Sequence, residues 1–474
     1  MRIVLAALCS AVAAMVFAAP AAAEIAWSPY RYELASGQVI DAELGTLSVP
    51  AHRDRGSGAI TLRFVRLRAT APRTGPPILY LAGGPGSSGI ESGRGSRWAL
   101  FEALRQEGDV ILLDQRGAGM SDPPPACSTP WTFPADQASS ETTFNASLER
   151  AARVCAAEWR AAGIDIAAYN TAENAADVAD LARALGGRVR LVGISYGTFL
   201  AFAVLRDHAD LVERVVLAGT EGPDDTVKLP TQADNVLARL SARVARDPAA
   251  SRLTPNLRRS VAAVFAHLAA HPERVSIGDQ SLVISQYDAQ MVTAFLMATS
   301  ENAVRLPALY AATEAGNYSH LGRVVLSLRR FLAPLPAMPL ATDAASPVSE
   351  SRRNRATQLV RRSLFGNAVN VPSADFADAL GVPILPERWR APLHTSTPAL
   401  FISGDLDSRT PPENAEHERR GFRKSAHLIL RGAGHDNDLF LSSPLILERI
   451  RAFLRGDRVR DESIAVDLLH FGAD

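Results

Sequence analysis

A serine set between two glycines is the feature that most constrains how this chain can fold. Residues 189–194 are mostly apolar and predict a buried strand, and residues 198–205 predict an apolar helix. Between them, Gly193, Ser195 and Gly197 form a G-x-S-x-G pattern. The glycines permit close strand-helix packing, and the sharp turn lifts the serine hydroxyl clear of the sheet. The pattern therefore predicts a nucleophilic Ser195, although a glycine-rich connector without chemistry is the competing interpretation.

Alternating and continuous apolar runs predict the strands around this turn. Residues 39–50 and 59–69 alternate apolar and polar side chains and predict an antiparallel hairpin at one edge of a sheet. Continuous apolar runs, typical of strands buried on both faces, occur at 77–82, 109–114, 214–219, 398–403 and 427–430. A helix at 171–185 with Thr171 as its N-cap precedes the serine strand.

The regular alternation of strands and helices stops between residues 223 and 395. There the periodicity is mostly helical, and a segment of this length is too long for a loop. We therefore predict an α/β fold with a mostly parallel central sheet. Its core consists of residues 24–222 and 396–474, and residues 223–395 form an inserted helical cap.

The first 23 residues are typical of a secretory signal peptide. Arg2 is followed by an apolar run to Phe17, and Ala21 to Ala23 supply small residues for cleavage before Glu24. A retained membrane anchor is the alternative. No later stretch is long and apolar enough to span a bilayer, so we expect export to the periplasm or the medium and no stable membrane insertion after cleavage.

The balance of charged residues and the number of cysteines indicate which partners the protein binds and whether its cysteines are oxidised. The chain carries 50 Lys and Arg against 50 Asp and Glu, which does not favour a nucleic-acid surface, so the expected partner is a peptide or a small molecule. Cys127 and Cys155 remain after signal cleavage and lie in one proline-rich excursion. In an oxidising compartment they predict a disulfide, with two unpaired thiols as the alternative.

Four groups follow strand ends that parallel topology brings to one edge of the sheet. They are the loop at 83–89, Ser195, Asp407 and His435. His435 would take the serine proton, and Asp407 would orient the imidazole and stabilise its charged form. Asp405 competes with Asp407 because both lie in the same turn.

The loop after the strand at 77–82 contributes to the same expected chemistry. Backbone N–H groups of Gly84 and Tyr196 would hold the oxyanion. Phosphate binding is the competing interpretation of this loop, but the spacing of a phosphate-binding motif is absent. Since no His, Cys and Asp cluster has metal-ligand spacing, we expect neither a metal nor another cofactor.

Taken together, five ordered segments resemble one group of enzymes. They are 83–86 (GGPG), 114–121 (DQRGAGMS), 193–197 (GISYG), 404–411 (GDLDSRTP) and 432–436 (GAGHD). The set is similar to the prolyl iminopeptidase and tripeptidyl aminopeptidase group of α/β-hydrolases. The resemblance implies an α/β-hydrolase fold and removal of N-terminal residues from peptides beneath a closing cap.

The resemblance also implies acidic groups that bind the free α-amine of the substrate. Glu221 follows a strand on the active edge and is the first candidate, and Glu301 in the cap is the second. The alternative for both is a solvated surface carboxylate. Ala82 stands where iminopeptidases commonly show His, which favours a tripeptidyl or broader specificity over strict proline specificity. An esterase or amidase with the same residues, and an inactive fold used for binding, are the other hypotheses.

Overall fold

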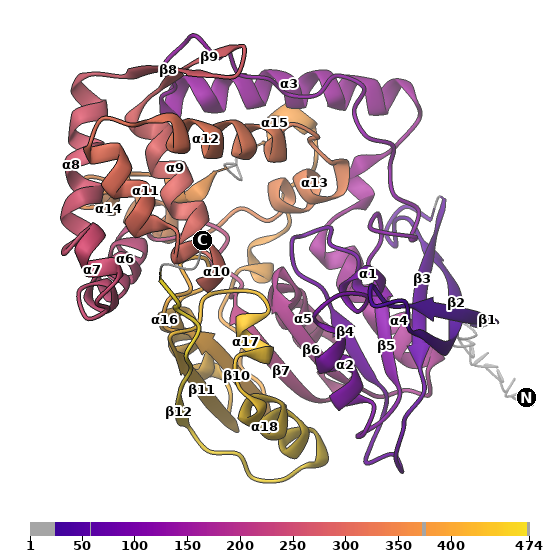
Figure 1. The fold of residues 1–474 in the computed structure, drawn as a ribbon. Coiled ribbons are helices and arrows are strands. Elements are labelled where there is room, and N and C mark those ends of the chain that lie inside the picture. The colour runs from indigo at the N-terminus through magenta and orange to yellow at the C-terminus, as the bar shows by residue number, and fades with distance from the viewer. Residues whose placement is uncertain (1–23, 57, 372–375, 472–474) are drawn as a thin grey trace, which may run out of the picture.

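A ten-stranded sheet organises the computed structural model, which describes residues 24–56, 58–371 and 376–471 (Figure 1). The expected signal peptide lies outside the described residues. In spatial order the strands are β1 (Ala26–Glu33), β2 (Val39–Pro50), β3 (Ala59–Leu67), β5 (Val110–Asp114), β4 (Ile78–Leu81), β6 (Val189–Ser195), β7 (Val212–Thr220), β10 (Ala399–Gly404), β11 (Ser425–Arg431) and β12 (Glu462–Ala465). The pairs among β1, β2, β3 and β5 are antiparallel, and all pairs from β5 to β12 are parallel.

This arrangement confirms the predicted mostly parallel sheet and its edge hairpin. The two edge strands β1 and β12 were not predicted. Most of their residues are exposed or half-buried, so their sequences lack the continuous apolar run of the central strands.

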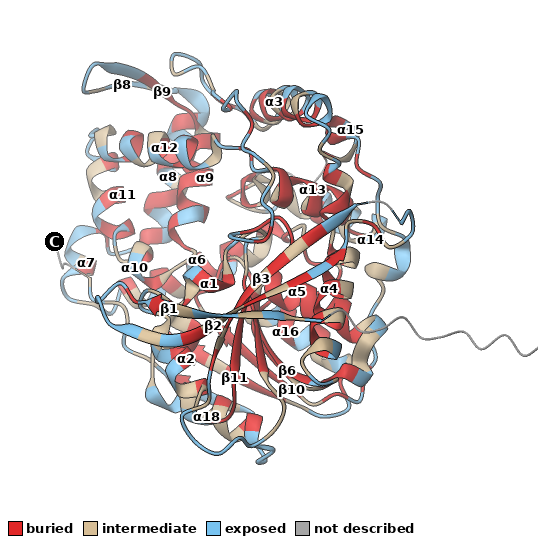
Figure 2. Cartoon of the chain, turned by 90° about the vertical axis from the view of Figure 1, so that its right-hand side faces the viewer, coloured by how far each residue is buried: buried red, intermediate tan, exposed pale blue. Residues whose placement is uncertain are grey.

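Both faces of the sheet are covered, and the strand sequences show why. In β4, Leu79 and Leu81 belong to one apolar cluster, while Ile78 and Tyr80 belong to the other. Because side chains alternate along a strand, each face of β4 is buried against its own layer of helices. Figure 2 shows this concentration of buried residues along the strands.

The core helices supply these layers. On one face lie α4 (Thr171–Ala184) and α5 (Tyr196–His208), and on the other lie α2 (Trp98–Leu104) and α18 (Pro444–Arg455). The shorter core helices are α1 (Gly89–Ser92), α16 (Pro412–Glu418) and α17 (Asp438–Leu441), with 3-10 turns η1 (Ile166–Ala168), η2 (Ala209–Leu211) and η5 (Arg419–Gly421).

The N-cap of α4 differs by one residue from the prediction. The Asn170 side chain accepts the N–H of Glu173 at 3.0 Å and caps the helix. Thr171 is instead buried, with its hydroxyl 3.2 Å from that of Tyr196. Thr171 therefore ties α4 to the turn that holds Ser195.

A helical layer lies over the carboxyl edge of the sheet (Figure 1). Between the core segments run α6 (Pro230–Val244), α7 (Ala250–Leu253), α8 (Leu257–Ala270), α9 (Gln286–Leu296), α10 (Ser300–Ala303), α11 (Leu306–Glu314), α12 (Ser319–Leu332), α13 (Ala337–Ala345), α14 (Glu350–Val360), η3 (Ala368–Asn370), α15 (Ala377–Leu380) and η4 (Glu387–Trp389). They include one short hairpin, β8 (Glu273–Ile277) and β9 (Gln280–Ile284). We call this layer the cap.

One helix of the cap comes from the first half of the chain. The proline-rich excursion contains α3 (Glu141–Ala161), which packs beside α15, and the N–H of Val283 donates to the carbonyl of Ala135 at 2.7 Å. The cap therefore includes residues outside the predicted 223–395 boundary. The helix α3 was not predicted, because its apolar positions lie among prolines and polar residues.

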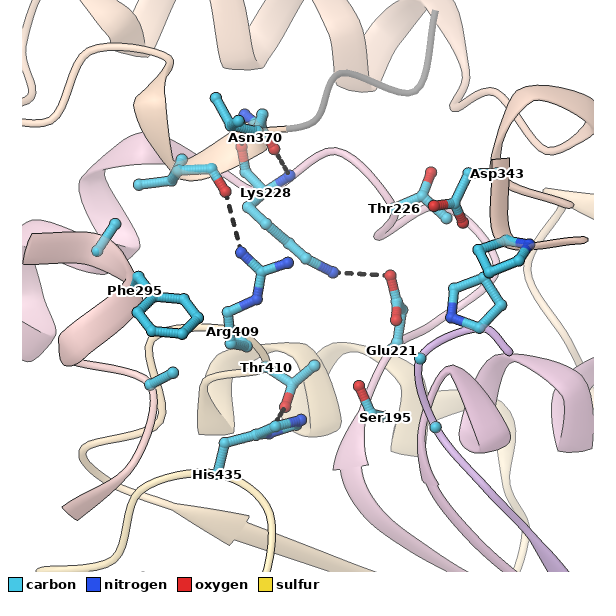
Figure 3. Close-up of a pocket in the computed structure, with 18 of the residues that line it drawn as sticks. Ser195, Glu221, Thr226, Lys228, Phe295, Asp343, Asn370, Arg409, Thr410 and His435 are labelled. Carbon is cyan, nitrogen blue, oxygen red and sulfur yellow. Dashed lines mark hydrogen bonds and ion pairs between the residues drawn. The ribbon is translucent and has the colours of Figure 1, made fainter. Parts of the chain in front are cut away.

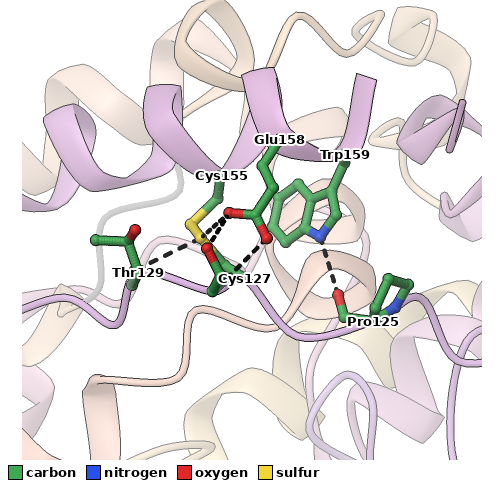
Figure 4. The surroundings of a disulfide bond; sticks show 7 residues. Pro125, Cys127, Thr129, Cys155, Glu158 and Trp159 are labelled. Carbon is green, nitrogen blue, oxygen red and sulfur yellow. Dashed lines mark hydrogen bonds between the residues drawn. A yellow bond between two sulfur atoms is a disulfide. The ribbon is translucent and has the colours of Figure 1, made fainter. Parts of the chain in front are cut away.

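The disulfide expected in this excursion is present between Cys127 and Cys155 (Figure 4). It closes a loop with a sequence separation of 28 and holds α3 to the segment before it. Glu158 on the same helix accepts hydrogen bonds from the backbone and hydroxyl of Ser128, each at 2.8 Å. Among the described helices none is by itself long and apolar enough to cross a membrane, although α12 and α13, bent by 85°, pass such a test as a pair.

Candidate active site

The turn after β6 holds Ser195 in a backbone conformation that side chains rarely adopt. Its φ is +54° and its ψ is −125°, and α5 starts at the next residue. A Cβ on Gly193 would lie 2.6 Å from the carbonyl oxygen of Gly197, and a Cβ on Gly197 would lie 2.0 Å from that of Leu81. Both positions therefore require glycine, which explains the G-x-S-x-G spacing.

An acid and an imidazole follow β10 and β11 at the same sheet edge. Nδ1 of His435 lies 2.7 Å from Oδ2 of Asp407. The Asp407 side chain is fully buried, while 14% of the His435 side chain is exposed. Because Asp407 binds Nδ1, the opposite ring nitrogen is free to act as a base in the cavity.

Asp407 is held as a carboxylate by its own turn. Its Oδ1 accepts the N–H groups of Arg409 and Thr410, each at 2.8 Å, and its Oδ2 accepts the Thr410 hydroxyl at 2.7 Å. Burial would raise the pKa of Asp407, but the charge of His435 and these hydrogen bonds outweigh burial and lower it. The acid therefore stays ionised and can stabilise an imidazolium.

The competing aspartate has a different function. Asp405 pairs with Arg243 at 2.8 Å and accepts the N–H of Gly432 at 2.7 Å. These contacts connect the two loops that carry Asp407 and His435. Since Asp405 has no hydrogen bond to His435 in the described part of the chain, Asp407 is the partner of the imidazole.

The glycine-rich loop after β4 lies against the serine. A Cβ on Gly83 would lie 3.1 Å from Cβ of Ser195, and Gly84 has a φ of +113°. The N–H of Tyr196 is the first of α5, where a helix has no internal acceptor. Gly83 thus lies against Ser195 and Tyr196 directly follows it, while the assignment of Gly84 and Tyr196 as oxyanion donors stays a prediction.

The DQRG segment holds this loop in place. Asp114 accepts the Ser88 hydroxyl at 2.5 Å and the N–H of Ile90 at 3.1 Å, and Gln115 donates to the carbonyl of Ala82 at 2.9 Å. These hydrogen bonds from Asp114 and Gln115 therefore fix the position of the glycine-rich loop.

A cavity of 1220 Å³ lies between this edge and the cap. Gly84, Ser195, Glu221 and His435 line it from the core, so it brings together most of the predicted site residues. In Figure 3, Ser195 and His435 lie at its floor. The cap contributes an apolar wall of Met291, Phe295, Leu328, Phe331, Leu335 and Leu340.

Glu301 is not one of the lining residues, contrary to the expectation that it binds a substrate amine. Its side chain is 84% exposed on α10, and its closest ion-pair contact is Arg305 at 4.0 Å. Four-residue spacing on the helix surface directs Glu301 toward Arg305 and solvent. The second candidate for the amine site is therefore wrong.

Glu221 does line the cavity, but it already has a cationic partner. The ammonium group of Lys228 lies 2.7 Å from its Oε1 and also donates to the carbonyl of Asp225 at 3.0 Å. Both side chains are nearly buried. A substrate amine at Glu221 would share this carboxylate with Lys228.

Asp343 on α13 is another carboxyl group that lines the cavity, and its function was not predicted from the sequence. Within the described ranges its carboxyl group has neither a hydrogen bond nor an ion pair. Burial, together with the charge of Glu221, raises the pKa of Asp343 to about 7, although Lys228 and Arg409 act against the shift. A carboxyl group in this situation gains most from a cationic ligand.

A possible metal cluster lies elsewhere. His52, Asp54 and Glu173 are close enough together to share an ion, but none of them lines the cavity. Glu173 already pairs with Arg53 at 2.6 Å, and His52 lies 2.9 Å from Asp165. The candidate chemistry at Ser195 does not involve this group.

Comparisons with known proteins agree with the geometry. Residues 76–439 match the alpha/beta hydrolase fold family. Serine protease Hip1 of Mycobacterium tuberculosis and of Mycobacterium bovis is 27% identical over 211 residues, which are 42% of this chain and 40% of the relative. The match thus spans about two-fifths of the length of these curated relatives.

Two solved structures illustrate the structural similarity. A proline iminopeptidase from Mycobacterium smegmatis aligns with 87% of this chain and 98% of its own, at 14% identity and a TM-score of 0.38. An epoxide hydrolase from an endophytic Streptomyces aligns with 90% and 98%, at 16% identity and a TM-score of 0.39. The family match covers residues 76–439, and the sheet carries the serine turn and the Asp407–His435 pair at one edge. The chain therefore belongs to the alpha/beta hydrolase fold family.

Proposed function

We propose that this protein is an exported serine exopeptidase that releases residues from the N-terminus of short peptides. The observation that carries the proposal is the unpaired carboxyl group of Asp343, which lies with Glu221 in the same cavity as Ser195 and His435. A buried ammonium group needs a carboxylate partner, so this arrangement suits a substrate with a free α-amine.

The reaction follows from the placement of the groups. Ser195 attacks the scissile carbonyl, and His435 takes its proton. The N–H groups of Gly84 and Tyr196 stabilise the oxyanion, a contribution of roughly 3 kcal/mol for each donor. His435 then protonates the leaving amine, and water releases the acyl group by the reverse sequence.

The size and chemistry of the cavity support a peptide substrate. Its 1220 Å³ exceeds the roughly 300–1,000 Å³ of pockets for single small molecules. The apolar cap wall can pack against substrate side chains. The partial match to a serine protease supports a peptide bond as the target.

Export is the second part of the proposal. The first 23 residues have the pattern of a signal peptide, and the Cys127–Cys155 disulfide is suited to an oxidising compartment. The presence of mature protein starting near Glu24 in the periplasm or the medium would support it. Full-length protein retained in the cytoplasm would contradict it.

The test of the activity compares free-amine and N-acetylated substrates on the purified mature protein. Alanyl, prolyl and tripeptidyl anilides with a free amine should be cleaved, and their N-acetylated forms should not. Ser195→Ala should lose nearly all turnover while unfolding at the same temperature. Asp343→Asn should raise KM for the free-amine substrates about tenfold, the value of one charge-assisted hydrogen bond.

A short acyl ester in the same experiment addresses the main alternative. If only the ester is cleaved and acetylation has no effect, the protein is an esterase and the aminopeptidase proposal is wrong. Retained turnover in Ser195→Ala would instead contradict the serine mechanism itself.

A further inference from the structure

Arg409 is a half-buried cation in the cavity whose charge has no ion-pair partner in the part of the chain that the structure describes. It lines the cavity two residues after Asp407, and its side chain makes one hydrogen bond, from Nη1 to the carbonyl of Val369 at 3.2 Å. By contrast, Lys228 and Arg97 line the same cavity and are paired with Glu221 and Asp436.

An unpaired guanidinium in such a place is suited to an anionic ligand group. It presents five N–H donors in a planar fork, and only one nitrogen of Arg409 has an acceptor in the described structure. A carboxylate can accept two of the remaining N–H groups side by side. Within the described ranges the cavity thus offers an acid without an ion pair, Asp343, and a half-buried base without an ion pair, Arg409.

The two groups lie on different sides of the reacting atoms. Figure 3 shows Asp343 and Arg409 on opposite sides of the Lys228–Glu221 pair, with Arg409 above Thr410 and His435. The Thr410 hydroxyl lies 3.1 Å from Nδ1 of His435. Because His435 protonates the leaving amine, the leaving part of the substrate departs on the side of His435 and Arg409.

We propose that Arg409 determines specificity by binding a carboxylate on the leaving part of the substrate. The inference rests on the proposed aminopeptidase function and names its substrate class. The preferred substrates are short peptides whose amine binds at Asp343 and Glu221 and whose carboxylate binds at Arg409. The carboxylate is either the free C-terminus or an acidic side chain just after the scissile bond.

Three peptides distinguish these sources. They are trialanine, its C-terminal amide, and an amidated peptide with glutamate after the scissile bond. We expect kcat/KM for trialanine to exceed that of its amide by roughly 10- to 100-fold, the value of a charge-assisted hydrogen bond. If the glutamyl amide is cleaved as well as trialanine, the acidic side chain is an accepted source. If it is cleaved like the simple amide, the C-terminus is the source.

Substitutions assign the preference to Arg409. In Arg409→Gln the preference for trialanine over its amide should fall to about 1, and Arg409→Lys should keep part of it. Arg362→Gln, which removes an exposed charge outside the cavity, should leave the preference unchanged. A purely structural link from Arg409 to Val369 would change the melting temperature and lower cleavage of all three peptides equally.

The outcomes separate this inference from the proposed function. Cleavage of all three peptides at equal rates by the unmodified protein, or an unchanged preference in Arg409→Gln, overturns the role of Arg409 and leaves the aminopeptidase standing. Failure to cleave any free-amine peptide or anilide overturns both. If Arg409→Gln does not fold, the test uses the preference for trialanine over its amide in the unmodified protein and in Arg409→Lys. A preference that is absent from the unmodified protein, or unchanged in Arg409→Lys, overturns the role of Arg409.

Discussion

At the scale of single residues, the site combines backbone strain at Ser195 with the ionisable groups of Asp343 and Arg409. Ser195 has a positive φ, which costs of order 1–3 kcal/mol and persists because β6, α5 and the flanking glycines hold it. Asp343 and Arg409 are ionisable groups that line the cavity, and neither has an ion-pair partner among the residues that the structure describes. Such groups are costly to folding unless a ligand uses them.

The pKa of Asp343 predicts how amine binding depends on pH. Because it is raised to about 7, the carboxyl group is neutral below about pH 7 and attracts an ammonium group only above it. A peptide α-amine loses its proton near pH 8. Affinity of Ser195→Ala for trialanine should therefore peak between about pH 7 and about pH 8. It should fall roughly tenfold by about pH 5.5.

Isothermal titration of Ser195→Ala across this range measures the effect without turnover. The combined variant Ser195→Ala with Asp343→Asn should lose the decrease on the acid side, and N-acetylated trialanine should show none. An identical acid-side decrease in the combined variant would assign the titration to another group.

At the scale of elements, buried polar contacts join segments that the sequence presents separately. Arg116 is fully buried, and its guanidinium binds both oxygens of Asp177 on α4 at 2.6 Å. It also donates to the carbonyls of Pro50 at the end of β2, Ala51 and Ala168. The DQRG segment thus joins the edge hairpin, α4 and the glycine-rich loop, which is a structural reason for its presence in the site.

The disulfide stabilises the element that extends from the core into the cap. Replacing Cys127 and Cys155 by serine should lower the free energy of unfolding by roughly 3–4 kcal/mol, since a loop of 28 residues is released in the unfolded chain. Turnover should persist at low temperature, because neither cysteine lines the cavity. Denaturant unfolding with and without reductant measures the difference, and a double variant as stable as the parent would contradict it.

At the scale of the whole molecule, the cap positions the imidazole as well as covering the cavity. The N–H of His435 donates to the carbonyl of Ala298 in the cap at 2.7 Å. Asp438 accepts the N–H of Ser300 in the cap at 3.1 Å and that of Gly434 at 2.8 Å. The loop carrying His435 is therefore held jointly by core and cap.

Asp438→Ala tests this coupling. It leaves two backbone N–H groups without their acceptor, at a cost of about 1–3 kcal/mol each if they stay buried. We expect kcat to fall about tenfold with little change in KM, since the cavity wall is intact while His435 is displaced. Glu301→Gln is the matched control. Glu301 lies next to Ser300 in the cap segment that Asp438 contacts, but its side chain is exposed, so this variant should behave like the parent. A larger change in KM than in kcat would show that the cap acts on substrate binding instead.

The sequence by itself determined the sheet without its two edge strands, the serine turn, and the order of the Ser195, Asp407 and His435 loops. These follow from local periodicity, from glycines that a tight turn requires, and from the rule that parallel strands end at one edge. The disulfide followed from the two cysteines that remain after the expected signal cleavage and from the oxidising compartment that such a signal implies.

Only the tertiary structure decided which charged groups face the cavity. Asp343, Lys228 and Arg409 come from three distant segments, and no local pattern distinguishes them from the many solvated charges of the chain. Glu301 has the same chemistry as Glu221, yet it lies in solvent because α10 presents it outward. Membership of α3 in the cap was likewise set by long-range packing against α15. Burial and pairing of charge depend on which helices meet, and that is a property of the folded chain as a whole.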